Sequence, residues 1–278
     1  MHPEVVAALR CPIEGDGFAL EGRTLRCPVG HAFDLARQGY VNLVVGRHPG
    51  TGDDAAMVAA RTAVQGEGRF AAVTDALADL VAELVPPDGV VVDLGAGTGH
   101  HLAGVLDRVP DRAGIAVDLS KHAARRAARC HPRVGAVVAD VWQDLPIGSG
   151  TAAAVLCVFA PRNAAEIVRI LRPDGVVVVV TPMRHHLGEL IGPLGLLEVD
   201  PRKQERLLAT LDPVADAVGP VRTVETTWRL DHEQVRALVA MGPSADHLDA
   251  DDLADRVGRL PAPVRVTLAV ELRAYRRR

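Results

Sequence analysis

One aspartate and three glycines at alternating positions carry the clearest chemistry in this 278-residue sequence: Asp93, Gly95, Gly97 and Gly99. They follow an apolar run at residues 90–92, which predicts a buried strand, and precede a helical pattern at residues 102–106. Glycine allows positive φ and lets a ligand approach the main chain without a Cβ in the way. The start of the following helix offers free amide donors to an anionic group. The pattern therefore predicts a ligand site at the end of a strand.

Two further predicted strands also end in an aspartate. Residues 114–117 end at Asp118, roughly 20 residues beyond the glycine turn, where a nucleoside site places a carboxylate for the ribose hydroxyls. Residues 134–139 end at Asp140. Each aspartate alone could simply cap the next helix. Because three strands end in this way at one edge of a sheet, the pattern favours a nucleoside site.

The elements that must position these residues alternate between strands and helices, which is typical of a doubly wound α/β sheet. Apolar runs predict parallel strands at 89–94, 113–118, 134–139, 152–159 and 175–181. Helices are expected at 55–65, 71–85, 184–192, 203–218, 232–240 and 250–259, and closing antiparallel strands at 221–230 and 264–275.

Composition and charge limit the classes of function. The net charge of −4 gives no general attraction to a phosphate backbone, and the first 50 residues hold five arginines and five acids. A nucleic-acid contact would therefore need a local basic face, for which the candidates are Arg10, Arg23, Arg26, Arg37, Arg47 and His48. No segment approaches the roughly 20 apolar residues of a membrane span, and no leader pattern is evident. We expect a soluble, cytoplasmic protein whose last three arginines, 276–278, are disordered.

Four residues near the N-terminus have the spacing of a metal site: Cys11, Glu14, Cys27 and His31. A structural zinc site uses paired ligands on two turns, with the second pair about 12 or more residues after the first. The pattern C-x2-E-x12-C-x3-H has this frame, with a glutamate in place of one cysteine. Glutamate binds Zn²⁺ through oxygen, so a site of two cysteines, one histidine and one glutamate is one interpretation. The other is that the metal is lost and these side chains serve packing.

Together these motifs resemble the bacterial 23S rRNA (guanine-N1)-methyltransferase family, in particular its actinobacterial macrolide-resistance (tylosin-resistance) branch. The glycine turn resembles the first motif of S-adenosylmethionine-dependent methyltransferases. The matching segments cover nearly the whole chain: 27–43, Asp53, Met57, 60–61, 68–70, 95–101, 117–121, 159–163, 181–182, 186–187 and 241–243. Two departures are Glu14, where the family has cysteine, and Phe70, where it has tyrosine.

The resemblance implies a Rossmann-like class I methyltransferase sheet with a small N-terminal zinc-ribbon-like module. Residues 1–45 would form a substrate-recognition module, 46–88 a linker with helices, and 89–278 the methyltransferase domain. It further implies S-adenosylmethionine and Zn²⁺ as cofactors, a homodimer, methyl transfer to N1 of one guanine in a 23S rRNA hairpin, and a link to macrolide resistance. The alternative is a small-molecule (natural-product) methyltransferase with a repurposed N-terminal module, which Glu14 and the weakly basic module favour.

The resemblance also implies a set of cofactor-binding residues: Phe70, Asp93, Gly95, Ala96, Gly97, Gly99, His100, Asp118, Leu119, Asp140, Val141 and His186. The backbone of residues 95–99 would receive the methionine end of the cofactor, Asp118 the ribose, and Asp140 with Val141 the adenine. For His100 and His186, a surface or helix-capping role is the alternative.

Methyl transfer from a sulfonium is an in-line displacement, so alignment and exclusion of water dominate catalysis. The proton on guanine N1 must leave, and a carboxylate or histidine could act as general base. Asp53, His186 and His247 are candidates among which the sequence does not choose. Arg162 and Asn163 follow the fourth strand and could orient the guanine edge or its phosphate, although Asn163 could instead cap the next helix. Asp53, Arg162 and Asn163 are thus the candidate catalytic residues.

Overall fold

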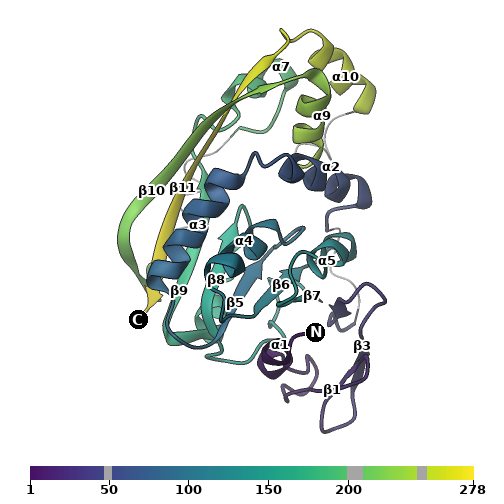
Figure 1. The fold of residues 1–278 in the computed structure, drawn as a ribbon, viewed down its shortest axis with the longest axis vertical. Coiled ribbons are helices and arrows are strands. Elements are labelled where there is room, and N and C mark those ends of the chain that lie inside the picture. Colours follow the sequence, from purple (N-terminus) through teal and green to yellow (C-terminus); the bar gives the residue numbers. More distant parts are fainter. Residues whose placement is uncertain (47–51, 199–208, 243–248) are drawn as a thin grey trace.

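The computed structural model describes residues 1–46, 52–198, 209–242 and 249–278 (Figure 1). Its centre is an eight-stranded sheet in the order β10-β11-β9-β8-β5-β6-β7-β4, and a three-stranded sheet, β1-β2-β3, lies near the N-terminus. The strands of the larger sheet are β4 (Val41–Asn42), β5 (Val90–Leu94), β6 (Gly114–Asp118), β7 (Val134–Val138), β8 (Ala152–Val158), β9 (Leu171–Pro182), β10 (Ala215–Leu230) and β11 (Val264–Arg277).

Five neighbouring strands, β5 to β9, run parallel and lie where the apolar runs predict them. They are rich in valine and almost completely buried, as a parallel sheet covered on both faces requires. The largest difference is at β9, which begins at Leu171 rather than at residue 175. The predicted doubly wound α/β architecture is confirmed.

Helices cover both faces of this sheet. One face packs against α3 (Ala71–Leu84), α4 (His100–Arg108) and α5 (Lys121–Ala127), and the other against α1 (Pro3–Ala8) and α6 (Ala164–Ile170). Leu77 and Leu102 on the first face, and Leu9 and Ile167 on the second, are fully buried. Burial of each such side chain contributes about 1.5–3 kcal/mol.

A second group of helices lies beyond the carboxyl ends of the parallel strands, at the top of Figure 1. It contains α2 (Ala55–Gly66), α7 (Gly188–Leu194), α9 (His232–Ala240) and α10 (Ala250–Gly258). All four are predicted from the sequence, although α7 begins at Gly188 rather than at residue 184. Asp54 caps α2 by accepting a bond from the Met57 amide at 2.8 Å. Within the described ranges, no helix is long and apolar enough to cross a membrane.

The helix predicted at residues 203–218 is wrong at its C-terminal end: Ala209 is helical, but residues 210–214 form turns. Residues 203–208 lie outside the described residues, and the chain from Ala215 onward is strand β10, which begins before the predicted residue 221. Ala215 pairs with Arg277 of β11 in an antiparallel ladder. The alanines at positions 215 and 217 have helical propensity, but pairing with a long neighbouring strand overrides that weak preference.

The expected disorder of the last three arginines is also wrong, because each arginine has a partner. Arg276 donates to the Asp174 carbonyl at 3.1 Å, and Arg277 donates to the Leu171 carbonyl at 3.0 Å. Arg278 pairs with the Asp216 carboxylate at 2.8 Å. These contacts hold the end of β11 against β9 and β10.

The N-terminal residues join the larger sheet as well as forming their own. Strands β1 (Ala19–Glu21), β2 (Thr24–Arg26) and β3 (Ala32–Asp34) form the small antiparallel sheet. The chain then enters β4, which pairs in parallel with β7 through Val41 and Val137. Val5 and Leu43 are buried in the same apolar cluster as Ile147 of the larger domain. A strand from the N-terminal region therefore makes the sheet eight-stranded.

Candidate active site

The turn between β5 and α4 requires glycine for two reasons. Gly95, Gly97 and Gly99 have φ values of +68°, +56° and +79°, in the left-handed region. A Cβ on Gly95 would lie 2.8 Å from the Cβ of Ala160, and one on Gly99 would lie 2.6 Å from the sulfur of Cys130. The turn thus brings the end of β5 against the loop after β8, with bare backbone between them.

Asp118 joins this turn to the end of β6. Its carboxylate accepts a hydrogen bond from the Gly97 amide at 2.8 Å and another from the Ser120 amide at 2.8 Å. Burial raises the pKa of Asp118, and these two backbone bonds oppose the rise. The two strand ends that the sequence predicts to lie together are therefore in contact.

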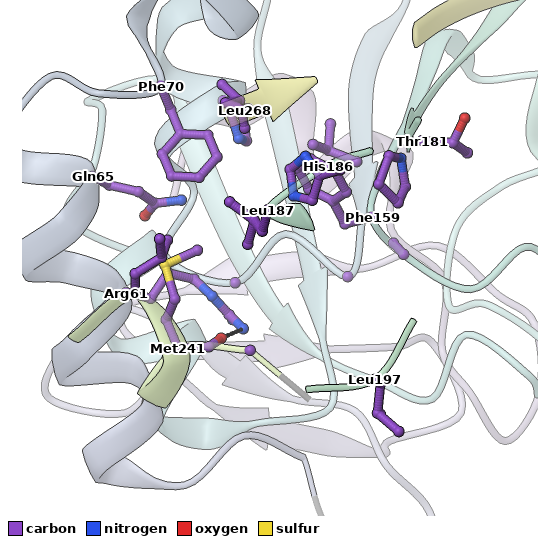
Figure 2. A pocket seen from close by; sticks show the side chains of 18 of the residues that line it. Arg61, Gln65, Phe70, Phe159, Thr181, His186, Leu187, Leu197, Met241 and Leu268 are labelled. Atoms are coloured by element: carbon purple, nitrogen blue, oxygen red, sulfur yellow. Dashed lines mark hydrogen bonds between the residues drawn. The ribbon is translucent and has the colours of Figure 1, made fainter. Parts of the chain in front are cut away.

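A cavity of about 700 Å³ opens at these strand ends (Figure 2). This volume lies within the range of roughly 300–1,000 Å³ that small-molecule and cofactor sites occupy. Several residues expected from the sequence line it: Phe70, Asp93, Gly95, Ala96, Gly97, Arg162 and His186. Others that are not among the predicted site residues join them, including Arg61, Gln65, His101, Trp142, Phe159 and Trp228.

The remaining expected residues lie beside the cavity rather than in its wall: Asp53, Gly99, His100, Asp118, Leu119, Asp140, Val141 and Asn163. The Asp140 carboxylate accepts a bond from the amide of Trp142, a wall residue, at 2.9 Å. Asp53 forms an ion pair with Arg61, whose Nη2 donates to the Met241 carbonyl at 2.8 Å. His247 lies outside the described residues.

The side chain of Asn163 has a structural role in this fold. Its side chain accepts a bond from the Glu166 amide at 3.4 Å and caps α6, as the alternative interpretation of the sequence stated. The cap uses Oδ1 only, so the side-chain NH2 group keeps its two donors and the catalytic role of Asn163 stays a prediction.

Asp93 is the residue in the cavity wall with the most unusual charge environment. Only 2% of its surface is exposed, and its Oδ1 has no hydrogen-bond partner among the described residues. Burial raises the pKa of Asp93 to about 8, and the nearby Asp118 carboxylate adds to the rise. A buried carboxylate of this kind calls for a cation, and the ammonium group of S-adenosylmethionine would satisfy it.

The histidines of the site are neutral. His101, rather than His100, lines the cavity, and burial lowers the pKa of His101 to about 3. Its Nδ1 lies 2.9 Å from the Thr74 hydroxyl. Burial likewise lowers the pKa of His186 to about 4, and its Nδ1 lies 3.1 Å from the Ala269 carbonyl.

Aromatic side chains gather at this cavity. The sequence holds eight aromatic residues (two Trp, two Tyr and four Phe), and Phe70, Trp142, Phe159 and Trp228 line the cavity. Phe70 and Trp228 are buried and pack edge to face, with ring centroids 5.5 Å apart. Trp142 and Phe159 are 57% and 44% exposed and so face the open space. Their rarity in the chain is the signal that could have identified them.

The N-terminal cysteines converge as a metal site requires. The sulfur atoms of Cys11 and Cys27 each lie 3.6 Å from Nδ1 of His31, and all three donor atoms lie within 4.8 Å of one another. Burial acts to raise the pKa of the Cys27 thiol, but hydrogen bonds, chiefly from the amides of residues 29–31, lower it below its ordinary value. Amides aimed at sulfur stabilise a thiolate, the form that binds metal.

Glu14 is not part of this group. Its side chain is exposed, and the cluster contains only the two cysteines and the histidine. The expectation of a four-residue ligand set is therefore corrected to three. The donor set still fits Zn²⁺, which accepts sulfur and imidazole ligands, although a closed structural site needs a fourth ligand beyond these three.

Comparison with known proteins agrees with this geometry. Residues 9–48 match the family model for the zinc-ribbon N-terminal domain of RlmA, and residues 91–175 match a methyltransferase domain. The parallel central strands, the glycine turn after β5 and the acid at the end of β6 agree with the methyltransferase match. The chain is therefore a class I methyltransferase, a class that uses S-adenosylmethionine.

Relatives cover nearly the whole length. The chain is 50% identical over 273 residues to the 23S rRNA (guanine(748)-N1)-methyltransferase of Streptomyces fradiae, covering 97% of each chain. It is 48% identical over 294 residues to a provisionally named 23S rRNA (guanine-N1)-methyltransferase of Micromonospora griseorubida, covering 99% of each. A provisionally named relative in Bacillus subtilis is 32% identical over 249 residues, covering 85% of this chain and 86% of its own. The chain belongs to the 23S rRNA (guanine-N1)-methyltransferase family.

Proposed function

We propose that this protein transfers a methyl group from S-adenosylmethionine to N1 of one guanine in a hairpin of 23S rRNA. The observation that carries the proposal is 50% identity, over 97% of both chains, to the Streptomyces fradiae enzyme that modifies guanine 748. This identity includes the N-terminal module, for which a small-molecule methyltransferase would have no need. The small-molecule alternative is therefore not favoured.

Different residues at the strand ends would bind different parts of the cofactor. Asp93 would hold the ammonium group, and the backbone of residues 95–99 would receive the carboxylate end. Asp118 would hold the ribose hydroxyls, and Asp140 would position Trp142 near the adenine. When bound, S-adenosylmethionine supplies a methyl group on a positively charged sulfur.

The upper helices and the aromatic residues would exclude water from the reaction. Phe70 is buried between Trp228 and His101, and forms an apolar wall of the cavity. Leu268 of β11 and Leu187 near α7 continue this wall (Figure 2). A dry cavity strengthens electrostatic interactions and aligns the attacking nitrogen with the methyl group.

Neither described candidate for the general base is well suited to neutral pH. The Asp53 carboxylate is paired with Arg61. His186, with a pKa of about 4, is a weak base toward the proton of guanine N1. We infer that the chain promotes loss of this proton by stabilising the anionic base rather than by supplying a strong proton acceptor.

Three further properties complete the proposal. Residues 1–45 form the RNA-recognition module and bind one Zn²⁺ through Cys11, Cys27 and His31, and residues 46–88 connect this module to the methyltransferase domain at 89–278. The protein acts as a homodimer, and its methylation protects ribosomes from macrolides. Light scattering and drug sensitivity of a methylation-deficient host expressing the chain test the last two properties.

The central test uses purified protein, labelled S-adenosylmethionine and 23S rRNA from a strain without the modification. Mapping should place one methyl group on N1 of a single guanine, with no label on other bases. Cofactor binding without any transfer to RNA, together with transfer to a small-molecule extract, would contradict the proposal in favour of the natural-product alternative.

A further inference from the structure

Backbone strain in the described residues is concentrated at the cavity. Phe159 and Leu187, at φ +54° and +53°, are the non-glycine residues with positive φ in the described ranges, and both line the cavity. This conformation is costly for a side chain with a Cβ and is typically kept where function requires it. At Phe159 its effect is to end β8 abruptly and leave the ring 44% exposed.

The Phe159 ring lies against His186 on one side and is open on another. His186 lies beside it, with ring centroids 5.9 Å apart and planes tilted by 39° (Figure 2). His186 is itself fixed by the backbone of Ala269, through contacts of 3.1 and 3.3 Å. A rigid aromatic ring that faces a cavity and rests on a neutral imidazole is a stacking surface for a flat base.

A buried cation without a partner stands three positions further along the same loop. Arg162 lines the cavity but is only 5% exposed, and its Nε and Nη1 have no hydrogen-bond partner among the described residues. The ionisable groups that act on it are the Cys157 thiol of β8 and the Tyr275 phenol of β11. Burial raises the pKa of both groups, so both are neutral near pH 7. A ligand with several hydrogen-bond acceptors would therefore satisfy the buried guanidinium of Arg162.

We propose that Phe159 and Arg162 form the guanine subsite, in which the ring stacks on the base and the guanidinium donates to O6. This inference rests on the proposed function and deepens it. Guanine presents O6 and N7 side by side, which matches the fork of an arginine. A phosphate lies outside the plane of a stacked base and would have to leave water to reach so buried a group.

This placement accounts for the loss of the N1 proton. Ionisation of N1 sends the proton to water and spreads the negative charge onto O6, where Arg162 stabilises it. The N1 electron pair then forms the new nitrogen–carbon bond while the electrons of the methyl–sulfur bond pass to sulfur. A fixed donor at a developing oxyanion in a dry site contributes about 10²–10³ in rate.

The test measures single-turnover methylation of a 23S rRNA hairpin between pH 6 and 10 for the full-length wild type and the R162Q and R162K variants. R162Q should be slower by about 100-fold at neutral pH, and this deficit should shrink as pH rises and N1 ionises in solution. R162K should recover part of the rate because it keeps the charge. A hairpin with 6-thioguanine at the target, whose N1 proton is more acidic, should also reduce the deficit.

R112Q is the matched control. Arg112 is buried too, but it donates to the Gly89 carbonyl at 3.0 Å at the opposite edge of the sheet. Its loss should lower stability and leave the pH profile unchanged. For Phe159, F159Y should retain hairpin affinity and F159L should lose about tenfold or more, since both carry the same backbone strain.

Several results would overturn the inference. They are an unaltered pH profile in R162Q, hairpin binding that weakens equally at every pH (a phosphate contact), or loss of cofactor binding in R162K. If R162Q does not fold, wild-type behaviour of R162K together with equal affinity of F159Y and F159L would refute it. A wild-type protein that methylates no guanine ends the proposed function and this inference together, whereas an active wild type whose Arg162 and Phe159 variants behave as the wild type does ends the inference alone.

Discussion

At the scale of single residues, the charge of Asp93 links stability to cofactor binding. Its pKa of about 8 exceeds the ordinary value near 4. Between about pH 4 and pH 8, the folded protein therefore holds a proton that the unfolded chain has released. The stability of the cofactor-free protein should therefore fall as pH rises from about 4 to 8. A bound ammonium group would remove this penalty.

D93N tests this linkage because it keeps the size and removes the charge. The variant should show a flatter dependence of stability on pH across that window and should bind S-adenosylmethionine more weakly, by about 2–5 kcal/mol as for a broken buried pair. Thermal unfolding across pH and calorimetric titration measure the two effects. D111N, at an exposed turn position, should change neither, and unchanged cofactor affinity in D93N would exclude the ammonium contact.

A second residue-scale prediction concerns the metal ligands. The E14C variant places a thiolate in the first turn. Both turns are closed by a glycine amide that donates to the cysteine carbonyl, Gly15 to Cys11 at 2.8 Å and Gly30 to Cys27 at 3.0 Å. E14C should hold Zn²⁺ more tightly than the wild type against a chelator, since it adds a thiolate as a fourth ligand to the three already in place. C27S should bind no stoichiometric zinc in elemental analysis. Equal zinc retention in the wild type and C27S would contradict the three-ligand site.

At the scale of elements, variants of Asn163 can distinguish a helix-capping role of this residue from a catalytic role. N163A should cost about 1 kcal/mol of unfolding free energy, measured by urea titration, with little change in the single-turnover rate. N163D and N163S keep a capping oxygen and should regain the stability. A rate that falls in N163S while the stability recovers would return Asn163 to the catalytic residues.

Elements were predictable where one physical cause dominates. The apolar runs of β5 to β8 are buried on both faces, and the Asp54 and Asp231 caps mark the starts of α2 and α9. The segment at 215–218 was misjudged because its partner in β11 lies about sixty residues away in sequence. The role of Arg61, which reaches Asp53 and Met241, depends on the same kind of distant contact.

At the scale of the whole molecule, the N-terminal module and the catalytic domain share one core. Leu43 follows β4, is 2% exposed, and donates its amide to the Val138 carbonyl at 3.0 Å. L43A should lower the free energy of unfolding by about 2–5 kcal/mol and leave a single unfolding transition. Calorimetry that resolves an early transition for the module alone would show two independent units.

The pairing of β4 with β7 also fixes the distance between the N-terminal module and the cavity. Strand β7 leads directly to Asp140, so the hydrogen-bonded strands set the spacing between the N-terminal module and the cavity. A flexible linker would leave that spacing variable. If the N-terminal module binds the RNA as proposed, this fixed spacing would select the distance between the bound part of the hairpin and the target base. A hairpin with the correct loop sequence but one base pair added to its stem should still bind the N-terminal module. It should place the wrong base, or no base, in the cavity.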